Sequence, residues 1–199
     1  MRKTNRASRV NKEKATIQAV FGLVLFLAVC FCIVRCACGR KDYQDFLNDL
    51  GMRESSGRYD AQNRYGYLGR YQMGSLALQE AGFQDSEGNW TQLANSFDIY
   101  SESDFLASPA GQDAAIEACH IKLCEYIRHY GLDEYVDTVY CGVRVTLSGL
   151  LAACHLVGAR SLRDALNAGE MVYDANHVSA AEYMNTFAGY DISHVWEAD

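Results

Sequence analysis

Glu54 is the residue whose type and position best suit acid–base chemistry. The apolar residues before it recur at spacings of three and four, as on the buried face of a helix, and they are Tyr43, Phe46, Leu47 and Leu50. Glu54 lies four residues beyond Leu50, so the same face carries a carboxylic acid toward the interior. Partial burial and a helix C-terminus, which Gly57 is expected to close, both favour the uncharged acid. A neutral carboxyl group suits a general acid that protonates a departing sugar oxygen.

The ordinary alternative is a glutamate in the last helical turn that faces solvent or pairs with Arg53 or Arg58. Two neighbouring motifs favour a chemical role. Residues 54–57 read Glu-Ser-Ser-Gly, and residues 63–74 read Asn-Arg-Tyr-Gly-Tyr-Leu-Gly-Arg-Tyr-Gln-Met-Gly. Together they resemble the first two motifs of the lysozyme-like soluble lytic transglycosylases, which cleave bacterial peptidoglycan. In that family the glutamate of Glu-Ser-Gly is the single catalytic acid, and a Gly-Leu-Met-Gln loop lines the sugar cleft.

The resemblance implies which residues contact the glycan. At the place of the Gly-Leu-Met-Gln loop this chain has Gly69, Arg70, Tyr71 and Gln72, so the glycine and the glutamine match and the middle pair differs. We therefore expect Gln72, Tyr71 and Arg70 to bind substrate, with subsite preference altered by the middle pair.

Two later segments also resemble the family. Residues 152–158, with His155, are similar to its Ala-Tyr-Asn-x-Gly helix, and Tyr183 is placed like its last motif tyrosine. The resemblance spans about residues 43–190. It implies substrate binding by His155 and Tyr183, and a buried core histidine is the alternative for His155.

The N-terminal part of the chain predicts a membrane anchor. Residues 1–14 form a basic tail, and a run without charge follows from Ala15 to Val34, long enough to span a bilayer as a helix. Basic residues before the run outnumber those after it, which favours a cytoplasmic N-terminus. We expect a single-pass signal anchor over 15–38 in the inner membrane and a domain over 42–199 in the periplasm or otherwise outside the cytoplasm. A cleaved signal peptide and a lipid-modified Cys30 are the alternatives.

The domain after the anchor is strongly acidic. Residues 1–41 carry +8 of a whole-chain charge of −7, which leaves −15 for the other 158 residues. Such a charge excludes nucleic acid as a partner, because binding to phosphate backbones needs neutralising cations. Arg53, Arg58, Arg64 and Arg70 nevertheless gather around Glu54. They form either a positive patch for peptidoglycan carboxylates or ordinary pairs with acidic neighbours.

The rest of the domain predicts a mainly α-helical, lysozyme-like fold. We expect helices over 75–81, from Pro109 to Tyr130, over 133–140, over 146–157, after Ser161 and after Ser179, and a loop over 83–105. The cysteines of this domain are Cys119, Cys124, Cys141 and Cys154, for which disulfides and free thiols remain open. Their spacing with the histidines matches no zinc site, and no metal or cofactor is expected.

These features predict an anchored lytic transglycosylase. Glu54 would protonate the β-1,4 glycosidic oxygen between N-acetylmuramic acid and N-acetylglucosamine, and would then activate the muramyl 6-hydroxyl to give a 1,6-anhydro product. The alternatives are a hydrolysing lysozyme, a phage-derived lytic protein, and a non-catalytic glycan-binding scaffold. Peptidoglycan strands are the expected partner, with an envelope or secretion complex as a further one.

Overall fold

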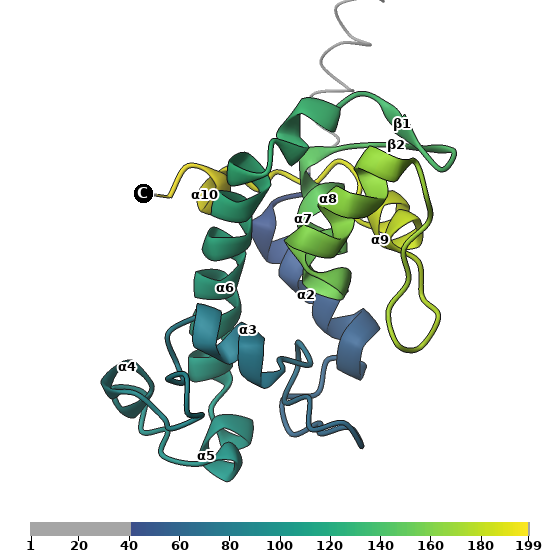
Figure 1. Cartoon of the computed structure of the whole chain (residues 1–199). Helices are drawn as coiled ribbons and strands as arrows, with labels where there is room; N and C mark the ends of the chain where they lie inside the picture. Colours follow the sequence, from purple (N-terminus) through teal and green to yellow (C-terminus); the bar gives the residue numbers. More distant parts are fainter. Residues whose placement is uncertain (1–40, 199) are drawn as a thin grey trace, which may run out of the picture. The chain divides into compact units, whose positions relative to one another are not determined.

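The computed structural model describes residues 41–198 of the chain, and this part is mainly helical, as predicted (Figure 1). Its elements in order are α2 (Tyr43–Ser55), α3 (Ser75–Glu80), α4 (Gln92–Asn95), α5 (Glu102–Ala107), α6 (Pro109–His129), the 3₁₀ helix η1 (Leu132–Tyr135), β1 (Val139–Tyr140), β2 (Val143–Arg144), α7 (Leu147–Val157), α8 (Ala159–Ala168), α9 (Ala180–Thr186) and α10 (Ser193–Trp196). The predicted tail 1–14 and anchor 15–38 lie outside the described residues. None of the helices described is long and apolar enough to cross a membrane.

Helix α2 carries Glu54 in its last turn. It begins with a capping box, in which Asp42 accepts a hydrogen bond from the Asp45 amide and Asp45 accepts one from the Asp42 amide. Its last helical residue is Ser55. The left-handed cap is Ser56, with φ of 57°, one residue before the glycine that was predicted to stop the helix. The Gly57 amide then donates to the Gly51 carbonyl, which closes the helix end.

Helix α6 connects the two halves of the described domain. Ser108 caps it and Pro109 occupies its first turn, as predicted. It packs against α3 and α5 along its lower part in Figure 1 and against α7, α8 and α10 along its upper part. Its buried face is not wholly apolar, since Leu123 is only half-buried and the polar ring of His120 is fully buried.

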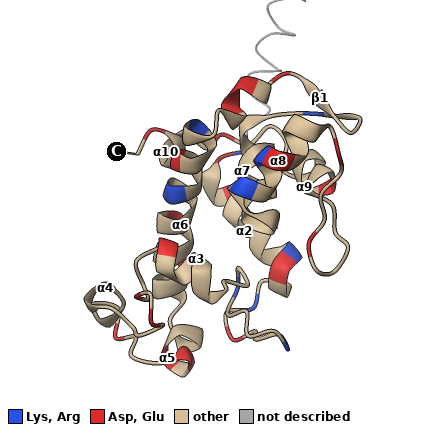
Figure 2. Cartoon of the chain, viewed as in Figure 1, with Lys and Arg blue, Asp and Glu red and all other residues tan. Residues whose placement is uncertain are grey.

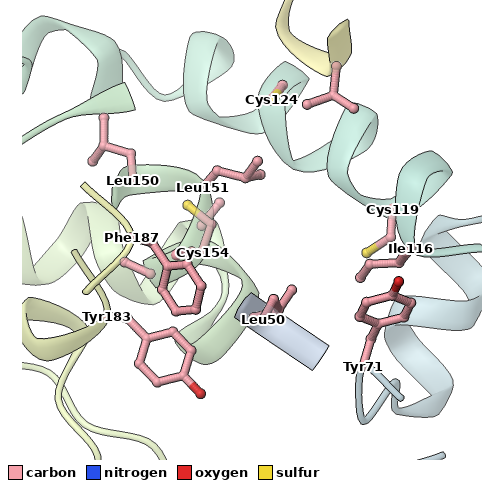
Figure 3. Close-up of a cluster of buried hydrophobic side chains, with 14 of the residues drawn as sticks. Leu50, Tyr71, Ile116, Cys119, Cys124, Leu150, Leu151, Cys154, Tyr183 and Phe187 are labelled. Atoms are coloured by element: carbon pink, nitrogen blue, oxygen red, sulfur yellow. The ribbon is translucent and has the colours of Figure 1, made fainter. Parts of the chain in front are cut away.

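Helices α7 and α9 make the most extensive helix–helix contact of the described domain. Leu150, Leu151 and Cys154 of α7 are buried, and Figure 3 shows them near Tyr183 and Phe187. Gly149 permits this approach, because a Cβ there would lie 2.8 Å from the Met184 carbonyl oxygen. The two helices thus meet backbone to backbone at a position that only glycine fills without a shift.

The first described residue is tied to the C-terminal part of the chain. The Lys41 ammonium lies 2.7 Å from Asp49 and 3.1 Å from the Tyr190 hydroxyl, which itself donates to Asp49 at 2.5 Å. The Asp191 amide donates to the Lys41 carbonyl at 2.7 Å. We call Lys41, Asp49 and Tyr190 the N-terminal clamp. It holds the start of the domain against the segment before α10.

Two regions differ from the sequence-based expectation. The predicted loop over 83–105 contains α4 and α5, which are capped by the hydroxyls of Thr91 and Ser101. These helices have one or two turns, too few to show a hydrophobic period. The helix expected over 133–140 is replaced by η1 and a two-residue hairpin of β1 and β2. η1 ends at Tyr135 because Val136 leaves the helical conformation, with ψ of 138°, and the left-handed Asp137 follows it.

The described cysteines are all free thiols. Cys119, Cys124 and Cys154 are buried, and Cys141 is exposed. Burial raises the pKa of Cys119 and of Cys124 to about 12, so both stay protonated and unreactive at neutral pH.

Gly149→Ala should destabilise the domain by about 1–3 kcal/mol, the usual cost of overpacking a well-packed contact. Helix propensity alone predicts the opposite sign, a gain of roughly 0.5–1 kcal/mol. Urea unfolding followed by circular dichroism separates the two. Arg160→Ala, at an exposed position of α8, is the control, and a stabilised Gly149→Ala variant would refute the close contact of α7 with α9.

Candidate active site

Glu54 meets a tyrosine from the far end of the chain. The side chain of Glu54 is 17% exposed, and its Oε1 accepts a hydrogen bond of 2.5 Å from the hydroxyl of Tyr183 in α9. Figure 3 shows the Tyr183 hydroxyl pointing away from the apolar cluster that surrounds its ring. Glu54 therefore neither turns fully to solvent nor sits deep in the core.

Arg53 does not neutralise Glu54. Its guanidinium donates instead to Glu182 and lies over the Tyr183 ring, 4.5 Å from the centroid. In Figure 2 a blue and a red segment adjoin at the C-terminal end of α2, where Arg53 and Glu54 follow each other in the chain. Burial, followed by the charge of Glu54, raises the pKa of Tyr183, so its hydroxyl remains a hydrogen-bond donor at neutral pH. Arg53 therefore does not form the ion pair with Glu54 that was one of the ordinary alternatives for this glutamate.

His155 is the third member of the site. Its Nε2 lies 4.0 Å from Glu54 Oε1, and its side chain is 9% exposed. Burial lowers the pKa of His155, and the charge of Glu54 and the backbone of Tyr71 only partly oppose this. The imidazole is thus neutral near pH 7. The structure brings Glu54, His155 and Tyr183 together from α2, α7 and α9, and these contacts place His155 beside the acid.

A second histidine lies behind the first. His120 of α6 is fully buried, its ring meets the His155 ring edge-on with centroids 5.6 Å apart, and its Nδ1 lies 2.9 Å from the Tyr43 hydroxyl. Its Nε2 has no hydrogen-bond partner. Burial, followed by the nearby His155, lowers the pKa of His120 well below the ordinary value. The sequence analysis did not single out this residue.

The loop of residues 69–72, called the glutamine loop from here on, lies beside the C-terminal end of α2. The Ser55 hydroxyl, next to Glu54 in the chain, donates to the Arg70 carbonyl at 2.9 Å. Gln72 adopts a left-handed backbone conformation, with φ of 47°, and its side-chain amide donates to the Gly69 carbonyl at 2.9 Å. Gln72 is half-buried, so part of its side chain remains open to solvent near this loop.

Tyr71 and Arg70 are engaged inside the protein. Tyr71 is only 1% exposed, and its hydroxyl donates to Asp113 at 2.8 Å. The Arg70 guanidinium donates to the Tyr59 hydroxyl at 2.7 Å and to Asn48 at 2.8 Å. The predicted contact of these two side chains with a sugar has no support from their placement, since they stabilise the loop from within.

Gln112 and Asp113 hold this loop from the first turn of α6. The Gln112 carbonyl oxygen accepts from the Arg70 amide at 2.8 Å, and its amide group donates to the carbonyls of Tyr59 and Phe105 at 3.0 and 2.8 Å. A Cβ at Gly69 would collide with the Gln112 side chain, which explains the glycine of this motif. The sequence analysis missed both residues, because polar side chains in a first helical turn carry no distinguishing signal.

Two of the four arginines of the predicted positive patch are engaged by other groups. Arg53 is exposed but pairs with Glu182, and Arg70 is half-buried and donates to Tyr59 and Asn48. Arg58 lies 3.7 Å from Asp60, and Arg64 donates to the Tyr65 hydroxyl at 2.7 Å. Arg58 and Arg64 are both exposed, so an anionic group of a ligand can reach them.

Within residues 41–198, no group of three or more histidine, cysteine, aspartate or glutamate side chains is arranged to hold a metal ion. Comparison of the chain with protein-family models, with curated proteins and with solved structures found no match.

Gln112→Ala should destabilise the domain by about 2–3 kcal/mol, because it leaves one buried N–H and two carbonyls of neighbouring segments without partners. Chemical denaturation measures the loss. Gln44→Ala, at an exposed position of α2, should change stability by less than about 0.5 kcal/mol. Equal effects of the two substitutions would show that the loop does not depend on Gln112.

Stability should fall as the pH decreases from about 6.5 toward 5. His120 and His155 have lowered pKa values in the folded protein, so the unfolded chain binds protons in this range that the folded chain does not. The free energy of unfolding then falls by at most about 1.4 kcal/mol per pH unit for each histidine. His155→Gln should reduce this slope in urea titrations at several pH values, and His129→Gln, an exposed change on α6, should leave it unaltered.

Proposed function

We propose that this chain is a peptidoglycan lytic transglycosylase in which Glu54 is the single acid and base. The observation that carries the proposal is the hydrogen bond from Tyr183 to Glu54 Oε1, since a tyrosine of a late helix reaches the one acid that the motif resemblance selects. The long central α6 between two groups of helices is compatible with a lysozyme-like fold. The Tyr183–Glu54 hydrogen bond and the position of α6 thus support the same hypothesis as the sequence resemblance.

The geometry suits proton transfer by one oxygen of Glu54. Tyr183 occupies Oε1, which orients the carboxyl group and leaves Oε2 to carry the proton. Glu54 gives this proton to the glycosidic oxygen as the bond from that oxygen to C1 of N-acetylmuramic acid breaks. The carboxylate then removes the proton of the muramyl 6-hydroxyl, whose oxygen bonds to C1. Glu54 ends protonated, so the cycle needs neither water nor a second carboxylate.

The surroundings of Glu54 favour this reaction over hydrolysis by two carboxylates. A hydrolysing glycosidase uses a second acid to hold water or to attack the sugar. The carboxylates of Glu182 and Asp113 are engaged by Arg53 and by two tyrosines, Tyr59 and Tyr71. The polar contacts of the Glu54 carboxyl group within the described residues are with Tyr183 and His155, neither of which has a carboxyl group.

The proposed setting follows from the sequence. Peptidoglycan strands outside the cytoplasm are the substrate, and the predicted helix over 15–38 anchors the domain in the inner membrane. Arg58 and Arg64 are exposed, and the proposal assigns to them the carboxylates of lactyl groups or stem peptides.

A non-catalytic glycan-binding scaffold is the second candidate. It is favoured by one observation, the internal placement of Arg70 and Tyr71. Gln72 is half-buried and its side chain makes a local bond to the Gly69 carbonyl, so it remains partly open to a sugar. A binder would keep the loop as a docking surface for glycan, within an envelope or secretion complex, without the acid step.

Glu54→Gln should lower the digestion of purified peptidoglycan by about 10²–10⁴-fold, the usual contribution of a general acid or base. The full chain is assayed, and its products are identified by mass spectrometry. Glu197→Gln, an exposed change near the C-terminus, is the matched control. Anhydro-muropeptides from the unaltered chain support the proposal, reducing ends indicate a lysozyme, and the absence of products indicates a binder.

A further inference from the structure

The environment of His155 is unusual for a residue next to an acid. A histidine near a carboxylate commonly gains a proton and forms an ion pair. Here the ring lies in a nearly dry position, with Nε2 4.0 Å from Glu54 Oε1, beyond the length of a direct hydrogen bond. The fully buried His120 meets its ring edge-on. The site therefore contains a potential cation that is kept uncharged.

The charge of His155 matters for the acid step. A cation at about 4 Å favours the ionised form of a carboxyl group, and a partly buried site strengthens this effect. Glu54 must carry a proton to protonate a leaving oxygen, so a charged His155 would oppose the step. An uncharged imidazole fills the same space without this effect.

We propose that His155 is a positioning residue for Glu54, held as an uncharged imidazole against the ring of His120, and that protonation of His155 stops the acid step. This inference rests on the proposed function of Glu54. It replaces the sugar contact that the sequence suggested for His155 with a role in setting the charge beside the acid.

The groups that face the two rings can be named for each packed element. Glu54 and Tyr43 face them from α2, and the backbone of Tyr71 faces His155 from the glutamine loop. Tyr183 of α9 reaches the site through Glu54. Burial lowers the pKa of His155, and the charge of Glu54 partly restores it, so protonation occurs at a pH below the ordinary histidine range.

The kinetic test compares two substitutions of His155 on soluble glycan strands with the full chain. His155→Gln places a neutral amide nitrogen near the position of Nε2, and His155→Leu removes the polar group. We expect His155→Gln and His155→Leu, neither of which can carry a charge, to retain most of kcat at neutral pH with little change in KM. The activity of the unaltered chain should decline at a pH below the ordinary histidine range, and this decline should vanish in both variants. A sugar-binding role would instead raise KM, and an unchanged acid decline in His155→Gln would overturn the proposal.

A second test needs no catalysis. Nuclear magnetic resonance titration of the histidine rings measures the pKa of His155 directly in the full chain and its variants. We expect a value below the ordinary histidine pKa, a further decrease in Glu54→Gln, and an increase toward the ordinary value in His120→Ala, which admits water. His120→Phe keeps the ring contact and should cause a smaller change.

The two tests separate the possible failures. If the chain digests no peptidoglycan but His155 responds to Glu54→Gln and His120→Ala as described, the proposed function fails while the coupling of these groups stands. If the chain digests peptidoglycan but His155 titrates at the ordinary histidine pKa and does not respond to either substitution, the positioning role is wrong and the enzyme assignment remains.

Discussion

The hydrogen bond between Tyr183 and Glu54 joins residues 129 positions apart, and each requires its own helix to be fixed in place. The Tyr183 ring is held among buried side chains of α7 and α9, so only its hydroxyl is left to extend toward α2. That arrangement depends in turn on the absence of a side chain at Gly149, where α7 meets the α9 backbone. A carboxyl group at the edge of the core is thus oriented by packing several residues away from it.

A second set of contacts keeps the glutamine loop near the same carboxyl group. Gln112 and Asp113 satisfy backbone and hydroxyl groups of residues 59–71, and the Ser55 hydroxyl joins the loop to the end of α2. Because these bonds are partly buried, each lost partner would leave a polar group with reduced access to water unsatisfied. The loop is therefore positioned by α6 and α2 together, which explains why it needs both a glycine at 69 and the long side chain of Arg70.

Much of the helical fold could be predicted from the sequence, and the reasons are local. Ser108 with Pro109, and Thr146 with Gly158, are caps and stops that act within a few residues, so α6 and α7 were predicted closely. The single-turn α4 and the hairpin of β1 and β2 were missed, since neither is long enough to show a period. In the site, Glu54 was found from its place on an apolar stripe. The internal use of Tyr71 and the burial of His120 were not, because both depend on tertiary contacts with α6 and α2.

The N-terminal clamp determines how the domain would respond to a tether. Lys41 is held by Asp49 and Tyr190, and its carbonyl by Asp191, at the end of α2 opposite to Glu54. Thirteen helical residues separate the two ends, a distance of about 20 Å. Tension on the chain at residue 41 would thus be shared with the C-terminal segment before it reached the carboxyl group. Glu54, Tyr183 and His155 would then keep their spacing while the start of the domain bears the load.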